Sequence, residues 1–234
     1  MTGKHARPSK NSTPPLSDVA ADDLSANRPG QSARIEAERQ RQEQRQRSRI
    51  FDFLARATDA KTAERAWRVG ANGEETVGKK LEELAVEGWR VLHSVPVGNK
   101  GSDIDHMLMG PAGVFTLNTK MHPGGKVWVG ERSIRVNGHP VPYLRNSRFE
   151  GERASRLLTE AVGWPVFVTP VLVFLTGSLI PDVTIKQEPE GVLVLNRMNV
   201  LKRFRRLPQR HTRDQIEAIY EAARRRETWQ PSTA

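Results

Sequence analysis

Residues 70–122 read GANGEETVGKKLEELAVEGWRVLHSVPVGNKGSDIDHMLMGPAGVFTLNTKMH, and this stretch decides the fold class. Its first part has helical periodicity from Asn72 to about Glu87 and ends at Gly88. Glu75 lies three residues after Asn72, which is the spacing of a capping box at a helix N-terminus. We therefore predict a helix over this part, with Asn72 and Glu75 capping its start.

Strand patterns follow this helix and continue beyond the quoted stretch. A short turn, GPAG at residues 110–113, joins the second predicted strand to the third. Strands are predicted at residues 90–97, 105–109, 114–120, 127–129, 134–136, 166–175 and 192–195, and a second helix at residues 143–161. This order of helices and strands indicates an α/β domain whose mixed β-sheet is flanked by helices.

Composition divides the chain into four segments. Residues 1–32 contain several prolines and only isolated apolar side chains, so we predict a disordered tail. Residues 33–67 begin with strong helix formers and no apolar stripe, which predicts a long, polar, basic helix followed by a short one. Residues 68–196 hold the α/β domain, and residues 197–234 form a basic helical segment.

The charge balance favours a polyanionic partner. The chain of 234 residues has 37 Lys and Arg against 27 Asp and Glu, a formal net charge of +10. Such an excess fits nucleic acid, although an excess that only maintains solubility is the alternative. There are no cysteines, which excludes disulfides, thiolate catalysis and cysteine-ligated zinc or iron–sulfur sites.

No segment of the sequence indicates export or membrane insertion. The N-terminus is polar and has no apolar stretch of the kind found in signal peptides. The longest apolar run, residues 164–181, is short for a membrane span and is interrupted by Pro165 and Pro170. A buried strand fits this run better, and we expect a cytoplasmic protein without a membrane partner.

Glu74 shares the apolar stripe of the first predicted helix with Val77, Leu81 and Leu84. An ionised carboxylate on such a stripe needs a polar partner, a cation or a metal ion. The alternative explanation is its place in the first helical turn, where the helix dipole favours acids.

Polar side chains also gather on the second and third predicted strands. Asp103 and Asp105 point to one face of their strand, and Asn118 and Lys120 share a face of the next. Pairing across the short turn brings Asp105 near Asn118 and Lys120. With Glu74, these side chains form an oxygen-rich site that suits Mg²⁺ or Mn²⁺, at which the lysine would orient or deprotonate a water molecule. An ordinary Asp–Lys ion pair at a strand end is the alternative.

Other catalytic patterns are missing from the sequence. His93, His106 and His122 have spacings that match no compact zinc motif. There is no nucleophile elbow of a serine hydrolase and no phosphate-binding loop of an NTPase.

Over about residues 70–128, the sequence resembles the nuclease-related domain (NERD) family. The resemblance rests on GANGEETVGKKLEEL, then VLHSVPV, then GSDIDHMLMGPAGVFTLNTKMHPGGKVWV, and it extends more loosely through RNSRFEGERASRLL. It implies the restriction-endonuclease-like fold of the PD-(D/E)xK nucleases for the domain at residues 68–196.

The resemblance also implies roles for individual residues. Glu74 matches the helix acid of the family, Asp105 its metal-binding aspartate, and Lys120 the lysine of its acid-x-Lys motif. Asn118 departs from the pattern because it stands where the motif has Asp or Glu. An amide oxygen can still bind Mg²⁺ but adds no negative charge, and Asp103 is a further candidate ligand that could replace that charge.

The basic residues of the last segment are candidates for phosphate contacts. Clustered Lys and Arg supply most of the non-specific affinity for nucleic acid, whereas a charge run on a helix can also be a solvated face. The candidate nucleic-acid-binding residues are Lys202, Arg203, Arg205, Arg206, Arg224 and Arg225.

Three functions are compatible with these patterns. The first is a nuclease that hydrolyses DNA with low sequence specificity, uses Mg²⁺ or Mn²⁺, and has Glu74, Asp105, Asn118 and Lys120 as catalytic residues. The second is a nucleic-acid-binding module that keeps the nuclease fold but is catalytically weak or inactive because of Asn118. The third is an interaction protein whose basic helices dock on an acidic partner.

Overall fold

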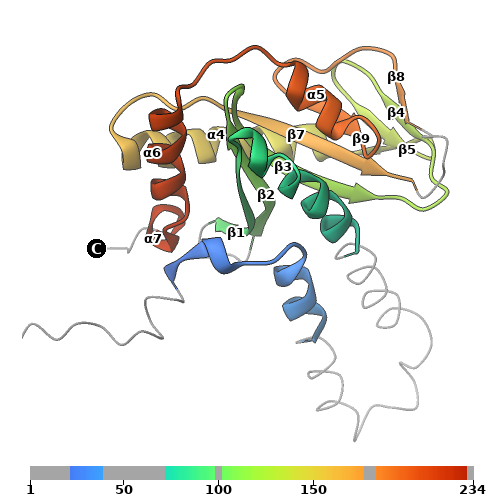
Figure 1. Ribbon diagram of the computed structural model, residues 1–234. Helices are drawn as coiled ribbons and strands as arrows, with labels where there is room; N and C mark the ends of the chain where they lie inside the picture. Colours follow the sequence, from blue (N-terminus) through green and yellow to red (C-terminus); the bar gives the residue numbers. More distant parts are fainter. Residues whose placement is uncertain (1–21, 39–71, 98–101, 177–182, 231–234) are drawn as a thin grey trace, which may run out of the picture.

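A five-stranded mixed sheet of order β1-β2-β3-β7-β9 forms the centre of the computed structural model (Figure 1). β1, β2 and β3 form an antiparallel meander, and β7 and β9 continue the sheet parallel to β3. The strands are β1 Arg90–Val97, β2 Ser102–Gly110, β3 Gly113–Met121, β7 Val168–Leu175 and β9 Leu193–Asn196. The structure describes residues 22–38, 72–97, 102–176 and 183–230.

A smaller sheet of order β6-β5-β4-β8 adjoins the first. Its strands are β4 Val127–Val129, β5 Ile134–Val136, β6 His139–Val141 and β8 Val183–Ile185. Val127, Val129 and Ile134 are buried in one apolar cluster with Leu172 and Phe174 of β7. This side of β7 therefore connects the two sheets.

Helices cover both faces of the five-stranded sheet. In front of the sheet in Figure 1, Val77 of the helix at residues 72–82 and Phe204 of α5 share a core with Phe115 of β3. On the other face, where Figure 1 shows α4 behind the sheet, Leu157 of α4 shares a second core with Ile219 of α6, and α7 packs against both helices. Their bounds are α4 Tyr143–Val162, α5 Val200–Arg206, α6 Arg213–Ala223 and α7 Arg226–Trp229. In the described part of the chain, no helix is long and apolar enough to cross a membrane.

The structure confirms the predicted strands and the long second helix, with ends that differ by a few residues. The predicted basic helical segment is divided into α5, α6 and α7. α5 ends at Arg206, and the next residue, Leu207, is extended because Pro208 follows it. α6 then begins with a capping box formed by Thr212 and Gln215.

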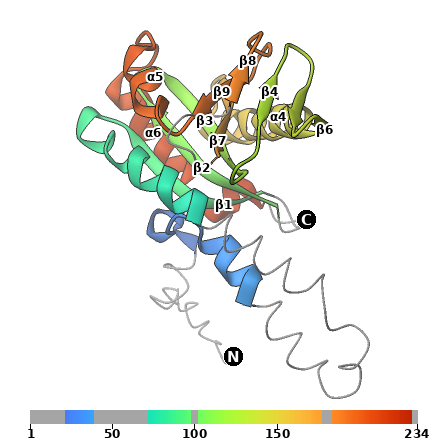
Figure 2. The same cartoon turned by 90° about the vertical axis from the view of Figure 1, so that its right-hand side faces the viewer.

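Part of the predicted disordered tail is folded, which corrects the boundary at residue 32. The 3₁₀ turn η1 (Leu24–Ala26) places a fully buried Leu24 in the core beside β1 and α6. The helix at residues 31–38 follows beneath β1, with Ala33 and Ala37 buried (Figure 2). The absence of a stripe of large apolar residues predicts a solvated helix here, but the buried face of the helix consists of alanines. The remainder of the two N-terminal segments, residues 1–21 and 39–71, lies outside the described residues.

The helix at residues 72–82 is confirmed, but its predicted capping box is wrong. Asn72 lies inside the helix, and the Glu75 carboxylate forms an ion pair with Arg34 from the N-terminal segment. A 3₁₀ turn, η2 (Ala85–Glu87), extends the helix to Gly88, which has a φ of 84°. Glycine adopts this left-handed conformation at low cost, so the helix ends where the sequence predicts.

Candidate functional site

The site begins where β2 separates from β3. Pairing of these strands runs from Gly110–Gly113 to His106–Leu117 and stops there. One residue further, Oδ2 of Asp105 accepts a hydrogen bond from the backbone N–H of Thr119 at 2.6 Å. A carboxylate thus satisfies a donor that the ladder no longer pairs, and Asp105 is fixed at the open end of the strand pair.

β1 is distorted at the same level. Ser94 has a φ of 48°, and the register between β1 and β2 skips Ser94 and Asp105. The side chain of Asn27 donates a hydrogen bond to the Ser94 carbonyl at 3.0 Å, so the N-terminal segment contacts the distorted position. A non-glycine residue in the left-handed region carries local strain, and such strain concentrates at functional sites.

β3 contributes an amide and a lysine to the site. Asn118 lies opposite Leu172 of β7, so its side chain belongs to the sheet face covered by α4. Oδ1 of Asn118 accepts a hydrogen bond from Nζ of Lys120. Nζ of Lys120 also lies 5.5 Å from the ring centre of Tyr143, a cation–π contact. Two contacts therefore orient the lysine at the end of the strand.

Glu74 reaches the same site from the helix on the other side of the sheet. The helix approaches β3 closely at Gly73, where an added Cβ would lie 3.2 Å from the methyl group of Thr119. Burial, and then the charge of Asp105, raise the pKa of Glu74 to about 8, whereas Lys120 acts to lower it. Burial likewise raises the pKa of Asp105, again opposed by Lys120. The helix acid, the strand acid and the lysine thus lie close enough to interact.

Asp103 also lies near this group of charges. It lines the cleft described below, and its charge raises the pKa of both Glu74 and Asp105. The structure therefore brings together all five residues of the predicted catalytic and metal site.

Glu150, on α4, belongs to the site although the sequence analysis missed it. Its Oε2 accepts a hydrogen bond from Nδ2 of Asn118 at 2.7 Å. Its Oε1 is shielded from solvent and has no hydrogen-bond partner among the described residues. Burial, followed by the charge of Asp105, raises the pKa of Glu150 to about 8. Glu150 lies three residues after the buried Ser147 and four residues before the buried Ala154, so it shares the buried face of α4. Glu74 stands out in the sequence for the same reason, and this helical spacing is the signal that could have identified Glu150.

The amide, the lysine and the α4 acid line one cleft with a volume of about 570 Å³. From α4, Arg145 and Arg153 add two cations and Phe149 adds a ring that is 65% exposed. Nε of Arg153 is shielded from solvent and has no hydrogen-bond partner in the described part of the chain. The cleft can therefore take an anionic group, with an aromatic surface beside it.

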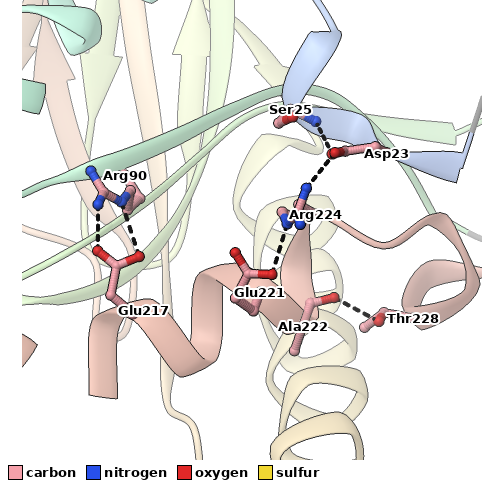
Figure 3. A network of polar contacts seen from close by, with 8 residues as sticks. All are labelled: Asp23, Ser25, Arg90, Glu217, Glu221, Ala222, Arg224 and Thr228. Atoms are coloured by element: carbon pink, nitrogen blue, oxygen red, sulfur yellow. Dashed lines mark hydrogen bonds and ion pairs between the residues drawn. The ribbon is translucent and has the colours of Figure 1, made fainter. Parts of the chain in front are cut away.

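The predicted nucleic-acid-binding residues are not brought together. Those at 202–206 lie on α5, whereas Arg224 and Arg225 follow α6 on the opposite face of the sheet. Arg224 is held by Asp23 and Glu221 (Figure 3). On α5, the guanidinium of Arg205 binds the Glu87 carboxylate at 2.7 Å. None of the six predicted residues is among the described residues that line the cleft.

The three histidines considered for zinc are divided between two places. Across β1 and β2, His93 and His106 face each other with their Nδ1 atoms 2.9 Å apart, and burial lowers the pKa of both. His122 instead contacts the hydroxyl of Tyr143 at 3.1 Å. Within the described residues, no group of three or more His, Cys, Asp or Glu side chains is placed to hold a metal ion.

The oxygen donors of the site nevertheless fit a cation that binds few protein ligands. Mg²⁺ usually keeps several waters and takes only one or two carboxylates from the protein. Asp105 offers one carboxylate, and Oε1 of Glu150, which forms no hydrogen bond of good geometry with the described residues, offers another oxygen. Asn118 Oδ1 is a further oxygen of the site, and it accepts a hydrogen bond from Nζ of Lys120.

A mixed sheet flanked by helices, with acids and a lysine where two strands separate, is a nuclease-like architecture. Residues 69–175 match the model of the family described as "Nuclease-related domain" (NERD). Over these residues the chain is therefore similar to the nuclease-related domain family, as the resemblance of its motifs predicts. Neither a search of curated proteins nor a search of solved structures gave a match.

Proposed function

We propose that the protein is a metal-dependent phosphodiesterase that hydrolyses DNA with low sequence specificity. The observation that carries the proposal is the meeting of Glu74, Asp105, Asn118 and Lys120 at the separated ends of β2 and β3. This site adjoins an open cleft that carries further cations. The nuclease-related domain supports nucleic acid as the partner.

Each residue has a role that its surroundings support. Asp105 and the Asn118 carbonyl would hold Mg²⁺ or Mn²⁺, with Glu74 and Asp103 as further acids. When bound, the cation neutralises charge on the phosphoryl oxygens and lowers the pKa of a bound water. Lys120 orients the attacking water and donates hydrogen bonds toward the oxygens on which negative charge develops.

The cleft would hold the nucleic-acid backbone. Arg145 and Arg153 form no ion pair with any described residue, which leaves both guanidinium groups available to phosphates. Phe149 can stack on a base at the rim, a contact that tolerates any sequence. Phosphate and stacking contacts carry little sequence information, which supports low specificity.

A second candidate function is supported by Asn118. This residue adds no charge, and its Oδ1 already accepts a hydrogen bond from Lys120. A module that binds nucleic acid through the cleft without cleaving it would have these properties. Its affinity would fall steeply with salt, because counterions are released on binding, and would not change with EDTA.

Plasmid nicking distinguishes these functions. Purified protein is incubated with supercoiled plasmid and Mg²⁺, Mn²⁺ or EDTA, and Lys120→Ala is compared with Lys126→Ala, an exposed lysine outside the cleft. Nicking that needs the metal, is lost in Lys120→Ala and survives in Lys126→Ala supports the nuclease. A plasmid that is shifted on the gel but never cut supports the binding module. A silent wild type with an active Asn118→Asp variant indicates a metal site that the amide has weakened.

A further inference from the structure

Close packing of α4 on the sheet places Glu150. α4 crosses β7 at Gly151, where an added Cβ would lie 2.9 Å from Cδ of Pro170. Pro170 is paired with Thr116 of β3, and Asn118 lies two residues further along the same face. The approach at Gly151 thus brings the preceding residue of the helix against the amide of the lysine motif.

The contacts of Asn118 define the orientation of its amide. Nδ2 donates to Oε2 of Glu150 at 2.7 Å, and Oδ1 accepts from Nζ of Lys120. A rotated amide would set its NH₂ group against the ammonium and its carbonyl against the carboxylate. Asp or Glu at position 118 would likewise place a second negative charge against Glu150. The amide on the strand and the acid on the helix are therefore complementary.

We infer that Glu150 supplies the metal-binding carboxylate that Asn118 does not, and that Glu150 and Asp105 bind one divalent cation between them. This inference rests on the proposed function. Oε1 of Glu150 is shielded from solvent and forms no hydrogen bond of good geometry with the described residues, although the nearby Thr116 hydroxyl acts to lower the pKa of Glu150; a cation would give this oxygen a strong partner. The two carboxylates are close enough for the charge of Asp105 to raise the pKa of Glu150. A cation between them would remove this repulsion and satisfy the unpartnered oxygen.

If Glu150 only orients Asn118 and binds no metal ion, a glutamine variant should behave like the wild type. Glutamine in place of Glu150 has the same shape and can still accept the Asn118 hydrogen bond through its carbonyl oxygen. Its amide oxygen adds no negative charge, so it should hold a divalent cation less tightly than the carboxylate does. Glu150→Gln therefore separates a metal ligand from a hydrogen-bond partner.

The test is the affinity for Mn²⁺, measured with the full chain from the electron paramagnetic resonance signal of free Mn²⁺ during a titration. The control is Glu152→Gln, an exposed acid of the same helix that does not line the cleft. We expect Glu150→Gln to weaken Mn²⁺ binding by at least about tenfold, and Glu152→Gln to leave it unchanged. The double variant Asn118→Asp/Glu150→Gln, which moves the acid back to the strand, should recover much of the lost affinity.

The outcomes separate this inference from the proposed function. If Glu150→Gln binds Mn²⁺ as tightly as the wild type, Glu150 is not a ligand, while plasmid nicking by the wild type still supports the nuclease. If the wild type binds no Mn²⁺ and cuts no plasmid, the inference and the proposed function both fail. Circular dichroism spectra of each variant, compared with that of the wild type, test whether a loss of Mn²⁺ affinity comes from a loss of fold.

Discussion

Replacing Glu150 by Gln should make the stability of the metal-free protein less dependent on pH. Glu150 places a carboxylate in a shielded position beside Asp105, and these surroundings raise its pKa from 4.5 to about 8. The folded state therefore holds the Glu150 proton more tightly than the unfolded chain does. Glutamine keeps the hydrogen bond from Asn118 but has no proton to lose in this range.

The sign and size of the effect follow from these two pKa values. Because the folded pKa is raised, the contribution of Glu150 to stability is complete below pH 4.5 and is lost as the pH rises through 8. Between pH 4.5 and pH 7 the loss amounts to about 3 kcal/mol, and it approaches about 5 kcal/mol above pH 9. Glu150→Gln lacks this loss, whereas Glu74 titrates in both proteins and largely cancels from the comparison.

Urea denaturation followed by circular dichroism, from pH 5 to pH 9 in EDTA, measures this difference. The free energy of unfolding of the wild type should fall more steeply with pH than that of Glu150→Gln, and the exposed-acid control Glu152→Gln should follow the wild type. Mn²⁺ in excess should reduce the loss in the wild type, since a ligand of the folded state stabilises it. Equal pH slopes for wild type and Glu150→Gln would refute the reasoning, because they would show that folding does not perturb this carboxylate.

Three further predictions test the cleft, the packing of α4 and the N-terminal segment. Arg153→Gln should weaken binding of a DNA oligonucleotide and reduce the salt slope of the binding constant by about 1, as measured by fluorescence anisotropy, whereas Arg156→Gln, outside the cleft, should change neither. Gly151→Ala should lower the free energy of unfolding by about 1–3 kcal/mol, because its methyl group would overlap the proline of β7; unchanged urea denaturation would show that α4 can move away. Leu24→Ala should cost about 2–5 kcal/mol in the same assay, and the exposed Ile35→Ala much less; equal small effects would show that residues 22–38 do not pack on the domain.

The elements that the sequence predicts well are those whose signals are local. The turn at residues 110–113 and the two-residue alternation around it fix the register of β2 and β3, and the register carries Asp105 to the level of Asn118. Gly88 ends the first helix because only a left-handed residue fits there. Periodicity and turn chemistry are properties of short segments, so one sequence is enough to read them.

Features that depend on distant packing were missed or wrongly bounded. Leu24 is an isolated apolar residue in a polar segment, and nothing local shows that β1 and α6 provide a buried site for it. Glu75 has capping-box spacing, yet its carboxylate is used by Arg34 from a segment that composition alone assigned to a solvated helix. In each case a partner far along the chain decides the outcome.

Net charge alone does not predict which cations of the folded chain are already paired with acids. The excess of +10 is a property of the whole chain, and the densest basic runs lie on helices whose arginines include Arg205 and Arg224. Those two guanidinium groups are already neutralised by acids, so a phosphate would have to displace a carboxylate to bind either of them. In the cleft, Arg153 has a shielded Nε without a hydrogen-bond partner among the described residues, and it lies on the same helix as Glu150. A phosphate bound at Arg153 would displace no carboxylate and would lie beside the acids and the lysine. One helix can therefore carry both the substrate contact and the acid that the strand lacks at Asn118.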